Sequence, residues 1–344
     1  MKLLILSNMY PSVQKPYSGV FVKNQYEYLQ KIKKAEDSIS IFYMKRSFTN
    51  KIGSLLKYFV AFIRFMPYYF KRYDVIHLHY FFPLGILIYL YKIIHPKTKT
   101  IVTFHGEDIR ANLTSKVLIK IFKIFSKKID FTISVGQDLK KDIETKLNLN
   151  VDLILSAGVD TKVFFPEQNV KKKYDYIFVG SFIYRKGIDI VIETIKKINN
   201  PNISFCFVGS GPFIEAIKNL KKDYNVTLFE NQTQHQLRVL YNESKFLLFP
   251  SRDEPFGLVA TESIFCGTPI IVSKVDGLKE QLIENKTGFF ATTHDEVFNI
   301  INKTYKLSDT EYNVLLENVL KANKQFGLKL VCEKLYTVYI DLIK

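Results

Sequence analysis

Short apolar runs alternate with longer amphipathic segments along nearly the whole chain. The runs are rich in Val, Ile, Leu and Phe, as in strands that a parallel sheet buries on both faces. The segments between them are long enough for helices, so the pattern predicts parallel α/β architecture. Strands are expected at 3–6, 38–43, 75–78, 100–103, 131–134, 152–155, 176–179, 204–208, 226–229, 246–250 and 270–272. Helices are expected at 21–33, 54–69, 115–126 and 328–344, among others.

The alternation is interrupted once, by a turn-rich connector at 156–166 that a run of three lysines follows. A chain of 344 residues suits two domains of ordinary size. We therefore expect two Rossmann-like, doubly wound domains, the first over 1–160 and the second over 161–327. Such sheets bind ligands beyond the carboxyl ends of their strands, so the expected site is a cleft between the two domains.

The composition is that of a globular protein, with 47 % hydrophobic and 24 % charged residues. The three cysteines are scattered and form neither a disulfide framework nor a metal-ligand cluster, which favours a reducing compartment. The apolar run after Met1 is too short for a signal peptide. The uncharged stretch 75–91 contains Pro83 and Gly85, and it fits a strand, a turn and a buried helix better than a membrane span.

The net charge of +16 is concentrated in the first half of the chain. Residues 1–160 contain 25 Lys+Arg and 12 Asp+Glu, a net +13, whereas residues 161–344 contain 24 and 21, a net +3. A general bias of the composition toward lysine is the alternative explanation, but it would raise both halves. The asymmetry therefore favours an anionic partner for the first half.

Segment 51–73 combines aromatic and aliphatic residues with Lys57, Arg64 and Lys71, which recur every seven positions and share one helix stripe. A basic, aromatic-rich amphipathic helix can lie in the interface of an anionic membrane. We therefore expect an anionic membrane surface as a partner of this half, and no nucleic acid. The alternative is a core helix whose basic stripe faces water, and Pro67 interrupts the helical pattern.

Glu254 and Glu262 flank the start of a helix that is expected to open at Gly257, directly after the buried strand 246–250. The free N–H groups of a helix's first turn form an anion site. The pair thus suits a ligand with a sugar at one carboxylate, a ribose at the other and a diphosphate on the amides between them.

Further clusters follow other expected strands. Gly19 precedes a helix and would let the backbone approach a phosphate. His105 is followed by a glycine and two acidic residues. Arg185 and Lys186 precede a helix whose dipole their charges oppose, a placement that diphosphate binding would explain. The Val-Gly-Ser-Gly-Pro run at 208–212 is similar to the start of a dinucleotide-binding motif, without its third glycine.

In order and spacing, these motifs resemble the retaining GT4 glycosyltransferases, which have the GT-B fold. The matching elements are Gly19 after the first strand, Thr-x-His-Gly at 103–106, Ser-x-Gly-Val-Asp at 156–160, Val-Gly-x-Gly-Pro at 208–212, Glu254-x7-Glu262 with its Phe-Gly, Gly-Thr-Pro at 267–269 and Thr-Gly-Phe at 287–289. The resemblance covers nearly the whole chain. It implies that the last helix, about 328–344, crosses back to the first domain.

The resemblance implies a hexosyltransferase-type enzyme that moves a sugar, with retention, from a UDP- or GDP-sugar to a glycan or lipid-linked acceptor. It places the enzyme in the synthesis of cell-surface polysaccharide or glycolipid, in the cytoplasm and peripheral at the inner face of the plasma membrane. The alternatives are a GT-B nucleotide-sugar epimerase and a binding partner without catalysis.

The resemblance also implies roles for individual residues. The donor-binding set would be Gly19, Arg185, Lys186, Gly257, Leu258, Val259 and Glu262. Within it, Glu262 would accept the ribose hydroxyls, and Arg185 and Lys186 would neutralise the diphosphate. Glu254 and His105 would be the catalytic residues at the donor sugar.

No Asp-x-Asp metal motif occurs in the sequence. Since basic side chains would then take the place of Mg²⁺, neither a metal nor a cofactor is expected. The chain departs from many relatives at two positions: Ser181 stands where an arginine is common, and Asp276 where a glycine is common. Asp276 puts the shape of the sugar pocket, and hence the identity of the donor, in doubt.

Overall fold

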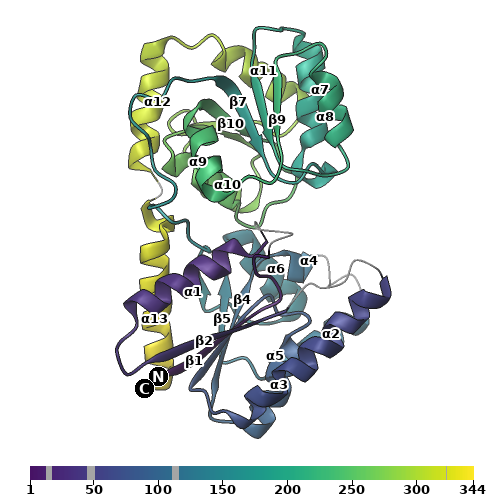
Figure 1. Cartoon of the computed structure of the whole chain (residues 1–344), viewed down its shortest axis with the longest axis vertical. Coiled ribbons are helices and arrows are strands. Elements are labelled where there is room, and N and C mark those ends of the chain that lie inside the picture. Colours follow the sequence, from purple (N-terminus) through teal and green to yellow (C-terminus); the bar gives the residue numbers. More distant parts are fainter. Residues whose placement is uncertain (13–17, 45–50, 111–115, 323) are drawn as a thin grey trace. The chain divides into compact units, whose positions relative to one another are not determined.

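The computed structural model describes residues 1–12, 18–44, 51–110, 116–322 and 324–344. The chain forms two compact units, unit 1 from Met1–Gly158 with Leu328–Lys344 and unit 2 from Val159–Gly327. Each unit is built on a six-stranded parallel sheet with helices on both faces (Figure 1). The predicted α/β fold class, with two doubly wound parallel sheets, is therefore confirmed.

The sheet of unit 1 has the strand order β2-β1-β3-β4-β5-β6. Its strands are β1 Lys2–Ser7, β2 Ser38–Tyr43, β3 Val75–His79, β4 Lys99–Phe104, β5 Phe131–Ser134 and β6 Leu153–Ile154. The central strands β1, β3 and β4 are buried along most of their length. This burial accounts for the unbroken apolar runs in the sequence.

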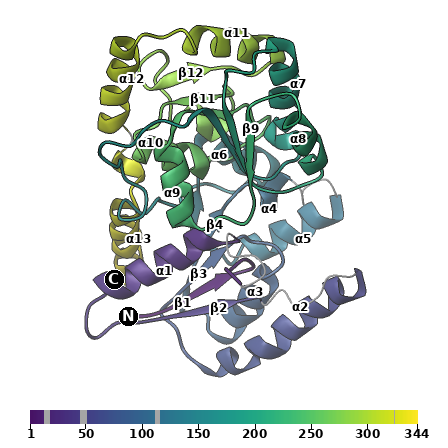
Figure 2. The ribbon, with the colours of Figure 1, turned by 45° about the horizontal axis from the view of Figure 1, so that its top comes forward.

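The helices of unit 1 are α1 Val20–Ile32, α2 Lys51–Phe65, the 3₁₀ helix η1 Met66–Phe70, α3 Gly85–Ile94, α4 Glu107–Arg110, α5 Lys116–Ser126, α6 Gln137–Leu147 and α13 Leu328–Ile343. Helix α1 packs against α13, and Figures 1 and 2 show this pair apart from α2, α3 and α5. Right-handed crossovers explain the division, because α1 leads toward one edge of the sheet and α2, α3 and α5 lead toward the other.

The prediction of a helix at 54–69 is wrong at the carboxyl end. Helix α2 ends at Phe65, and Pro67 lies in the first turn of η1, since proline has no N–H to continue an α-helix. The prediction that Lys57, Arg64 and Lys71 share one stripe of a single helix is therefore wrong as well. Arg64 turns back to donate a hydrogen bond to the Tyr43 carbonyl at 3.3 Å, and Lys71 lies beyond η1 as its C-cap.

The sheet of unit 2 has the strand order β12-β11-β10-β7-β8-β9. Its strands are β7 Tyr174–Val179, β8 Phe205–Val208, β9 Val226–Phe229, β10 Ser244–Phe249, β11 Ile270–Val272 and β12 Gly288–Phe290. Its helices are α7 Ile188–Ile198, α8 Ile214–Leu220, α9 Gln234–Asn242, α10 Leu258–Phe265, α11 His294–Thr304 and α12 Asp309–Lys321, with 3₁₀ helices η2 Tyr184–Lys186, η3 Asp276–Leu278 and η4 Lys324–Phe326.

The uncharged stretch 75–91 forms β3, a turn and most of α3, as the sequence predicts. Within the described residues, no helix has both the length and the apolar character needed to cross a membrane.

Candidate active site

In unit 2, the loop after β10 carries Glu254 and is tied to the loop after β7. The Ser251 hydroxyl is buried and hydrogen-bonds to the Arg185 carbonyl at 3.2 Å and to the Asp253 carbonyl at 3.1 Å. The Arg252 amide donates to the same Arg185 carbonyl at 2.8 Å. Both loops extend from the carboxyl ends of neighbouring strands, where a doubly wound sheet binds its ligands.

The predicted phosphate-binding cations are each paired with a predicted or neighbouring acid. The Lys186 ammonium forms an ion pair with the Glu254 carboxylate, and both side chains are largely buried. Arg185 lies 3.7 Å from the Asp253 carboxylate. Opposite charges thus stabilise the two basic residues near the start of α7, where the helix dipole alone would disfavour them.

A third ion pair fastens the same two loops together. The Arg252 guanidinium makes a bidentate contact with the Asp189 carboxylate at 2.8 and 2.7 Å and stacks on the Tyr184 ring, 3.8 Å from its centroid. Bidentate arginine–carboxylate pairs fix both direction and distance. The pair therefore holds the first turn of α7, which directly follows Arg185 and Lys186, against the loop that leads to Glu254.

Helix α10 begins immediately after this loop, as predicted. Gly257 is its N-cap, with φ +88°, and Leu258 and Val259 form the first turn, whose amides have no partner within the helix. The Gln281 amide donates to the Gly257 carbonyl at 3.2 Å, and its oxygen accepts from the Thr261 hydroxyl at 2.6 Å. The first turn of α10 is thereby held at the carboxyl edge of the sheet, where it is suited to an anion.

Glu262 lies on the second turn of α10 and hydrogen-bonds to a buried tyrosine. The Tyr241 hydroxyl donates to Glu262 Oε2 at 3.1 Å. Burial raises the pKa of Glu262 to about 7, although the hydrogen bond from Tyr241 acts in the opposite direction. A carboxyl group that changes its charge near neutral pH is a candidate for ligand binding.

Asp276, one of the two departures from the family pattern, lies beside Glu254. Its carboxylate accepts a hydrogen bond from the Glu254 amide at 3.3 Å, and the amide of Gly277 donates to the Glu254 carbonyl at 3.2 Å. Asp276 has φ +39°, an unusual value for a residue with a side chain. The segment around Asp276 thus fixes the backbone that presents Glu254.

The glycines of the 208–212 run have a packing role. A Cβ atom on Gly209 would lie 1.9 Å from the Gly180 carbonyl oxygen, because the loops after β7 and β8 press together there. The similarity of this run to a dinucleotide-binding motif therefore needs no phosphate to explain it.

In unit 1, His105 lies after β4 in a cluster of aromatic rings. His105 Nε2 is 3.1 Å from His79 Nδ1, and the rings of Tyr80 and Phe21 pack on it with centroids 4.5 and 4.8 Å away. Burial and the neighbouring His79 lower the pKa of His105 well below its usual range. Tyr80 has φ +64°, rare for a bulky residue, so the surrounding structure holds its ring on His105 at a cost in strain.

Gly19 is the N-cap of α1 and lies at the carboxyl edge of the same sheet. With φ +69° and a backbone approach that would put a Cβ atom 2.6 Å from Met9, only glycine fits. The predicted phosphate contact at Gly19 stays a prediction, because this packing alone accounts for the glycine. Residues 13–17, which precede it, lie outside the described residues.

Unit 2 thus brings together the predicted residues Arg185, Lys186, Glu254, Gly257, Leu258, Val259 and Glu262, while Gly19 and His105 belong to unit 1. Their roles stay predictions. The sequence reasoning missed Tyr241, the Arg252–Asp189 pair and the His79 contact. The adjacent charges Arg252-Asp253-Glu254 were the one available signal, since the other partners are far apart in sequence.

Two protein-family descriptions match the chain. "Glycosyl transferases group 1" matches residues 159–319, and "Glycosyltransferase Family 4" matches residues 30–163. An uncharacterized glycosyltransferase of Methanocaldococcus jannaschii is 28% identical, with 96% of each chain covered. The N-acetyl-alpha-D-glucosaminyl L-malate synthase of Bacillus anthracis is 24% identical, with 79% of this chain and 75% of that protein covered.

A solved structure also shares the fold. HepE from Anabaena, in complex with UDP and glucose, superposes with a TM-score of 0.77 over 99% of this chain and 100% of that chain, at 15% sequence identity. At this identity the likeness establishes the fold.

Proposed function

Because the chain belongs to the group 1 glycosyltransferases and has the GT-B fold, we propose that it transfers a sugar from a nucleotide-sugar donor to a glycan or lipid-linked acceptor. The donor would be a UDP- or GDP-sugar. The complex of HepE with UDP and glucose supports a nucleotide-sugar, and the name of the Bacillus anthracis relative supports transfer of a sugar residue.

The observation that carries this proposal is the Lys186–Glu254 ion pair beside the first turn of α10. A diphosphate on the amides of Leu258 and Val259 would offer Lys186 a stronger anionic partner than Glu254. Glu254 would then be released toward a hydroxyl of the donor sugar. The ion pair would thus hold both side chains in place before the donor binds. In the complex, Lys186 would contact the diphosphate and Glu254 would contact the sugar.

Glu262 would hold the other end of the donor. A carboxylate accepts hydrogen bonds from the two hydroxyls of a ribose, and Tyr241 orients the Glu262 carboxylate for that contact. Binding of the ribose would favour the ionised form of Glu262. Donor binding should therefore release a proton near neutral pH, because the pKa of the unliganded group is about 7.

We propose a retaining reaction that needs no metal. The bond between the sugar C1 and the diphosphate oxygen breaks, and the acceptor hydroxyl attacks C1 from the face that the diphosphate leaves. The hydroxyl proton passes to the departing phosphate oxygen. Arg185, Lys186 and the α10 amides would stabilise the negative charge that grows on the diphosphate, while the Glu254 carboxylate would stabilise the positive charge on the sugar.

The test has two stages. Thermal-shift measurements with a panel of nucleotides and nucleotide-sugars should reveal the donor, because a ligand of the folded state raises the unfolding midpoint. The donor so found is then incubated with lipid and glycan acceptors, with and without EDTA. Transfer that persists in EDTA with the anomeric configuration kept is expected.

Three results would count against the proposal. A sugar that changes configuration in the absence of an acceptor would identify an epimerase. Nucleotide binding without transfer to any acceptor would favour a non-catalytic partner. Full activity in both Glu254→Ala and Glu262→Ala would show that the donor does not bind at the proposed site.

A further inference from the structure

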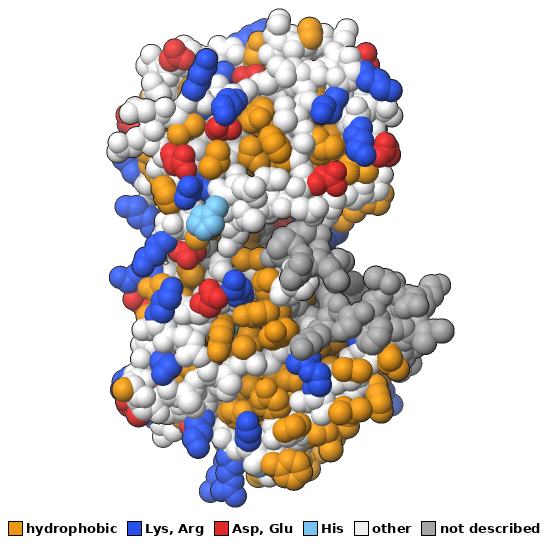
Figure 3. Space-filling model, in the orientation of Figure 1, with side chains coloured by type: hydrophobic (Ala, Val, Ile, Leu, Met, Phe, Trp, Pro, Cys, Tyr) orange, Lys and Arg blue, Asp and Glu red, His pale blue; other side chains and the backbone are white. Residues whose placement is uncertain are grey.

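The outer surface of α2, η1 and α3 in unit 1 is unusually apolar. Its exposed large hydrophobic side chains are Leu56, Tyr58, Phe59, Phe62, Ile63, Met66, Phe70, Ile86, Ile93 and Ile94, and we refer to them as the α2–α3 face. Phe70 is 86 % exposed and Phe59 is 62 % exposed. Figure 3 shows apolar side chains gathered over the part of unit 1 where these helices lie.

This exposure is not explained by the core of unit 1. Helix α2 already buries one stripe, Ala61 and Phe65, against the sheet. Phe59, Ile63 and Met66 follow one another at helical spacing on the other side, where a surface helix normally carries polar residues. A contiguous apolar surface of this kind marks an interaction site.

The charge around the α2–α3 face indicates the chemistry of the partner. Between Asp37 and Glu107 the only acidic residue is Asp74. The basic side chains of the same stretch that the structure describes as exposed or half-buried are Lys57, Arg64, Lys71, Arg72, Lys97 and Lys99. A second copy of the chain would bring like charges together at this face, whereas an anionic surface would be attracted.

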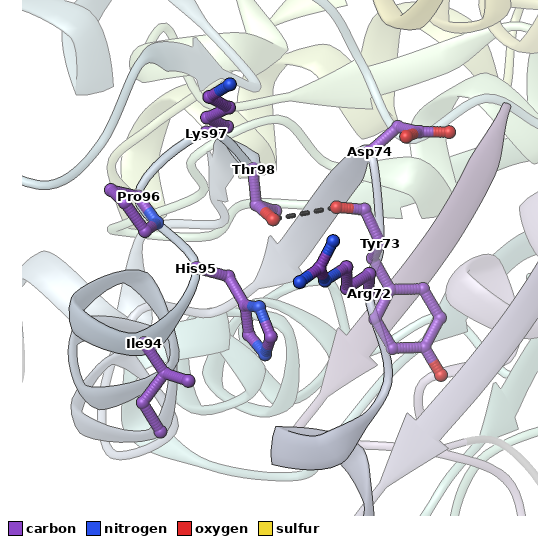
Figure 4. Close-up of a pocket in the computed structure, with 8 residues that line it drawn as sticks. All are labelled: Arg72, Tyr73, Asp74, Ile94, His95, Pro96, Lys97 and Thr98. Atoms are coloured by element: carbon purple, nitrogen blue, oxygen red, sulfur yellow. Dashed lines mark hydrogen bonds between the residues drawn. The ribbon is translucent and has the colours of Figure 1, made fainter.

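A cavity lies at the edge of the α2–α3 face, at the amino ends of β3 and β4. It has a volume of about 420 Å³ and is formed by segments 72–74 and 94–98 (Figure 4). Hydrogen bonds fix its walls: the Thr98 hydroxyl donates to the Tyr73 carbonyl at 2.7 Å, and His95 Nε2 bonds to the Tyr69 carbonyl at 2.7 Å. Ile94, a member of the α2–α3 face, lines the same cavity.

Two basic side chains, Arg72 and Lys97, line this cavity. Figure 4 shows the Arg72 side chain extending into the space between the two segments, while Lys97 extends outward at the rim. In the part of the chain that the structure describes, neither side chain has an ion-pair partner. The one carboxylate of the lining, Asp74, accepts a hydrogen bond from the Lys2 amide at 2.6 Å. Both cations are therefore available to an anionic group.

We propose that the α2–α3 face docks on an anionic membrane and that Arg72 and Lys97 bind the phosphate of a lipid headgroup at its edge. Phe59, Ile63 and Phe70 enter the boundary between headgroups and acyl chains, where exposed aromatic and aliphatic side chains are stabilised. The site lies at the amino edge of the sheet, whereas Gly19 and His105 lie at the carboxyl edge. The proposal does not depend on transferase activity.

Flotation of the full-length protein with phosphatidylcholine vesicles, with and without phosphatidylglycerol and without any donor, tests this proposal. We expect binding only to the vesicles that contain phosphatidylglycerol, and binding that weakens with salt. Phe70→Ser should weaken it roughly tenfold or more, because the exposed ring no longer enters the bilayer. Phe70→Ser should leave the thermal midpoint unchanged, since the side chain has little packing to lose.

The pocket is tested by Arg72→Gln with Lys97→Gln, which should weaken binding about fivefold for each charge removed. Lys31→Gln with Lys34→Gln is the matched control, because it removes the same charge beside α1, on the other side of the sheet. An equal loss in the control would overturn the phosphate site. Equal binding to uncharged vesicles, or no effect of Phe70→Ser, would overturn the membrane face.

Two further measurements distinguish a membrane from two other possible ligands of this surface, a second copy of the chain and a free anion. A dimer that dissociates in Phe70→Ser, seen by sedimentation, would assign the α2–α3 face to a second copy and overturn the proposal. Inorganic phosphate that stabilises the wild type but not the Arg72/Lys97 variant, with vesicle binding unchanged between them, would assign the pocket to a free anion.

Discussion

The candidate site residues at the carboxyl edges of the two sheets differ in chemical character. In unit 2, that edge carries the ion pairs Lys186–Glu254, Arg185–Asp253 and Arg252–Asp189. In unit 1, it carries His105 stacked among other rings, and burial keeps the pKa of its imidazole well below the usual range. The site in unit 2 is organised by charge, whereas the His105 cluster in unit 1 is organised by packed neutral rings.

The difference teaches what each edge is able to do. Paired charges can exchange one partner for another, so a charged ligand can take over one ion of an internal pair while the other ion turns to a second group of the same ligand. A packed neutral cluster has no partner to exchange, and it contributes shape and fixed hydrogen bonds. We therefore expect changes of charge to dominate the behaviour of unit 2, and changes of shape to dominate that of unit 1.

The largest effect is expected from Glu254→Gln, which keeps the size of the side chain and removes its charge. We expect kcat to fall about a hundredfold or more, because the charge that faces the developing positive sugar is lost. Steady-state kinetics with the identified donor measure this. Asp253→Asn, one residue away and paired with Arg185, is the matched control. If both variants lose the same activity, Glu254 has no special role.

The next effect is on nucleotide affinity. Glu262→Ala should weaken donor binding about tenfold to a hundredfold, the range for losing hydrogen bonds to a charged group. Isothermal titration calorimetry gives the dissociation constant directly. Glu317→Ala, an exposed change on α12, should leave it unaltered. Unchanged binding in Glu262→Ala would place the ribose elsewhere.

The raised pKa of Glu262 makes donor affinity depend on pH. The carboxylate must be ionised to accept both ribose hydroxyls, so affinity should rise about tenfold between pH 6 and pH 8. A nucleotide-sugar is the right probe, because its diphosphate does not ionise in this range. In Glu262→Gln the curve should be flat, since His105 stays neutral throughout. A curve that persists in Glu262→Gln would point to another group.

The same pKa has a consequence for stability. The folded protein raises the pKa of Glu262 from its ordinary 4.5 to about 7, so ionisation is disfavoured in the folded state. The wild type should therefore lose stability relative to Glu262→Gln as pH rises from about 4.5 to about 7, and the difference should be smallest at pH 4 and constant above pH 8. Thermal midpoints measured across this range test the sign.

The smallest effect is expected in unit 1. His79→Asn should lower kcat about tenfold and leave donor affinity unchanged. The substitution removes the ring that holds His105 in position, and it does not change the charge of the site. Chemical shifts of the His105 ring nitrogens should change with it. A fall in affinity instead would show that the histidine cluster acts through general structure.

The contrast also explains how much the sequence could predict. Strands β2, β5, β9 and β11 have the predicted bounds, because buried parallel strands are continuous apolar runs. Strand β12 was not among the predicted strands, since it begins with a glycine and has only two apolar residues, whereas the equally short β11 consists of β-branched residues. Helix α2 was predicted too long, because its apolar residues continue past Pro67 into η1.

The site was predictable where one segment supplies the residues. Glu254, Gly257 and Glu262 lie within one loop and helix, so their spacing alone indicates an anion site. Tyr241 could not be found in this way, because its contact with Glu262 depends on how α9 packs beside α10. The stacking of Tyr80 on His105 depends on a strained backbone that no composition or periodicity reveals.

Helix α13 has a consequence for how the protein is made. It adds Leu328, Val331, Cys332, Leu335 and Tyr339 to a core that otherwise comes from the first 133 residues, and the Tyr339 hydroxyl lies 2.6 Å from Nδ1 of the buried His77. Unit 2 is thus complete before unit 1 during synthesis. All six strands of the first sheet are thus made before the helix that covers one of its apolar faces, so we expect that face to be prone to aggregation until α13 packs on it.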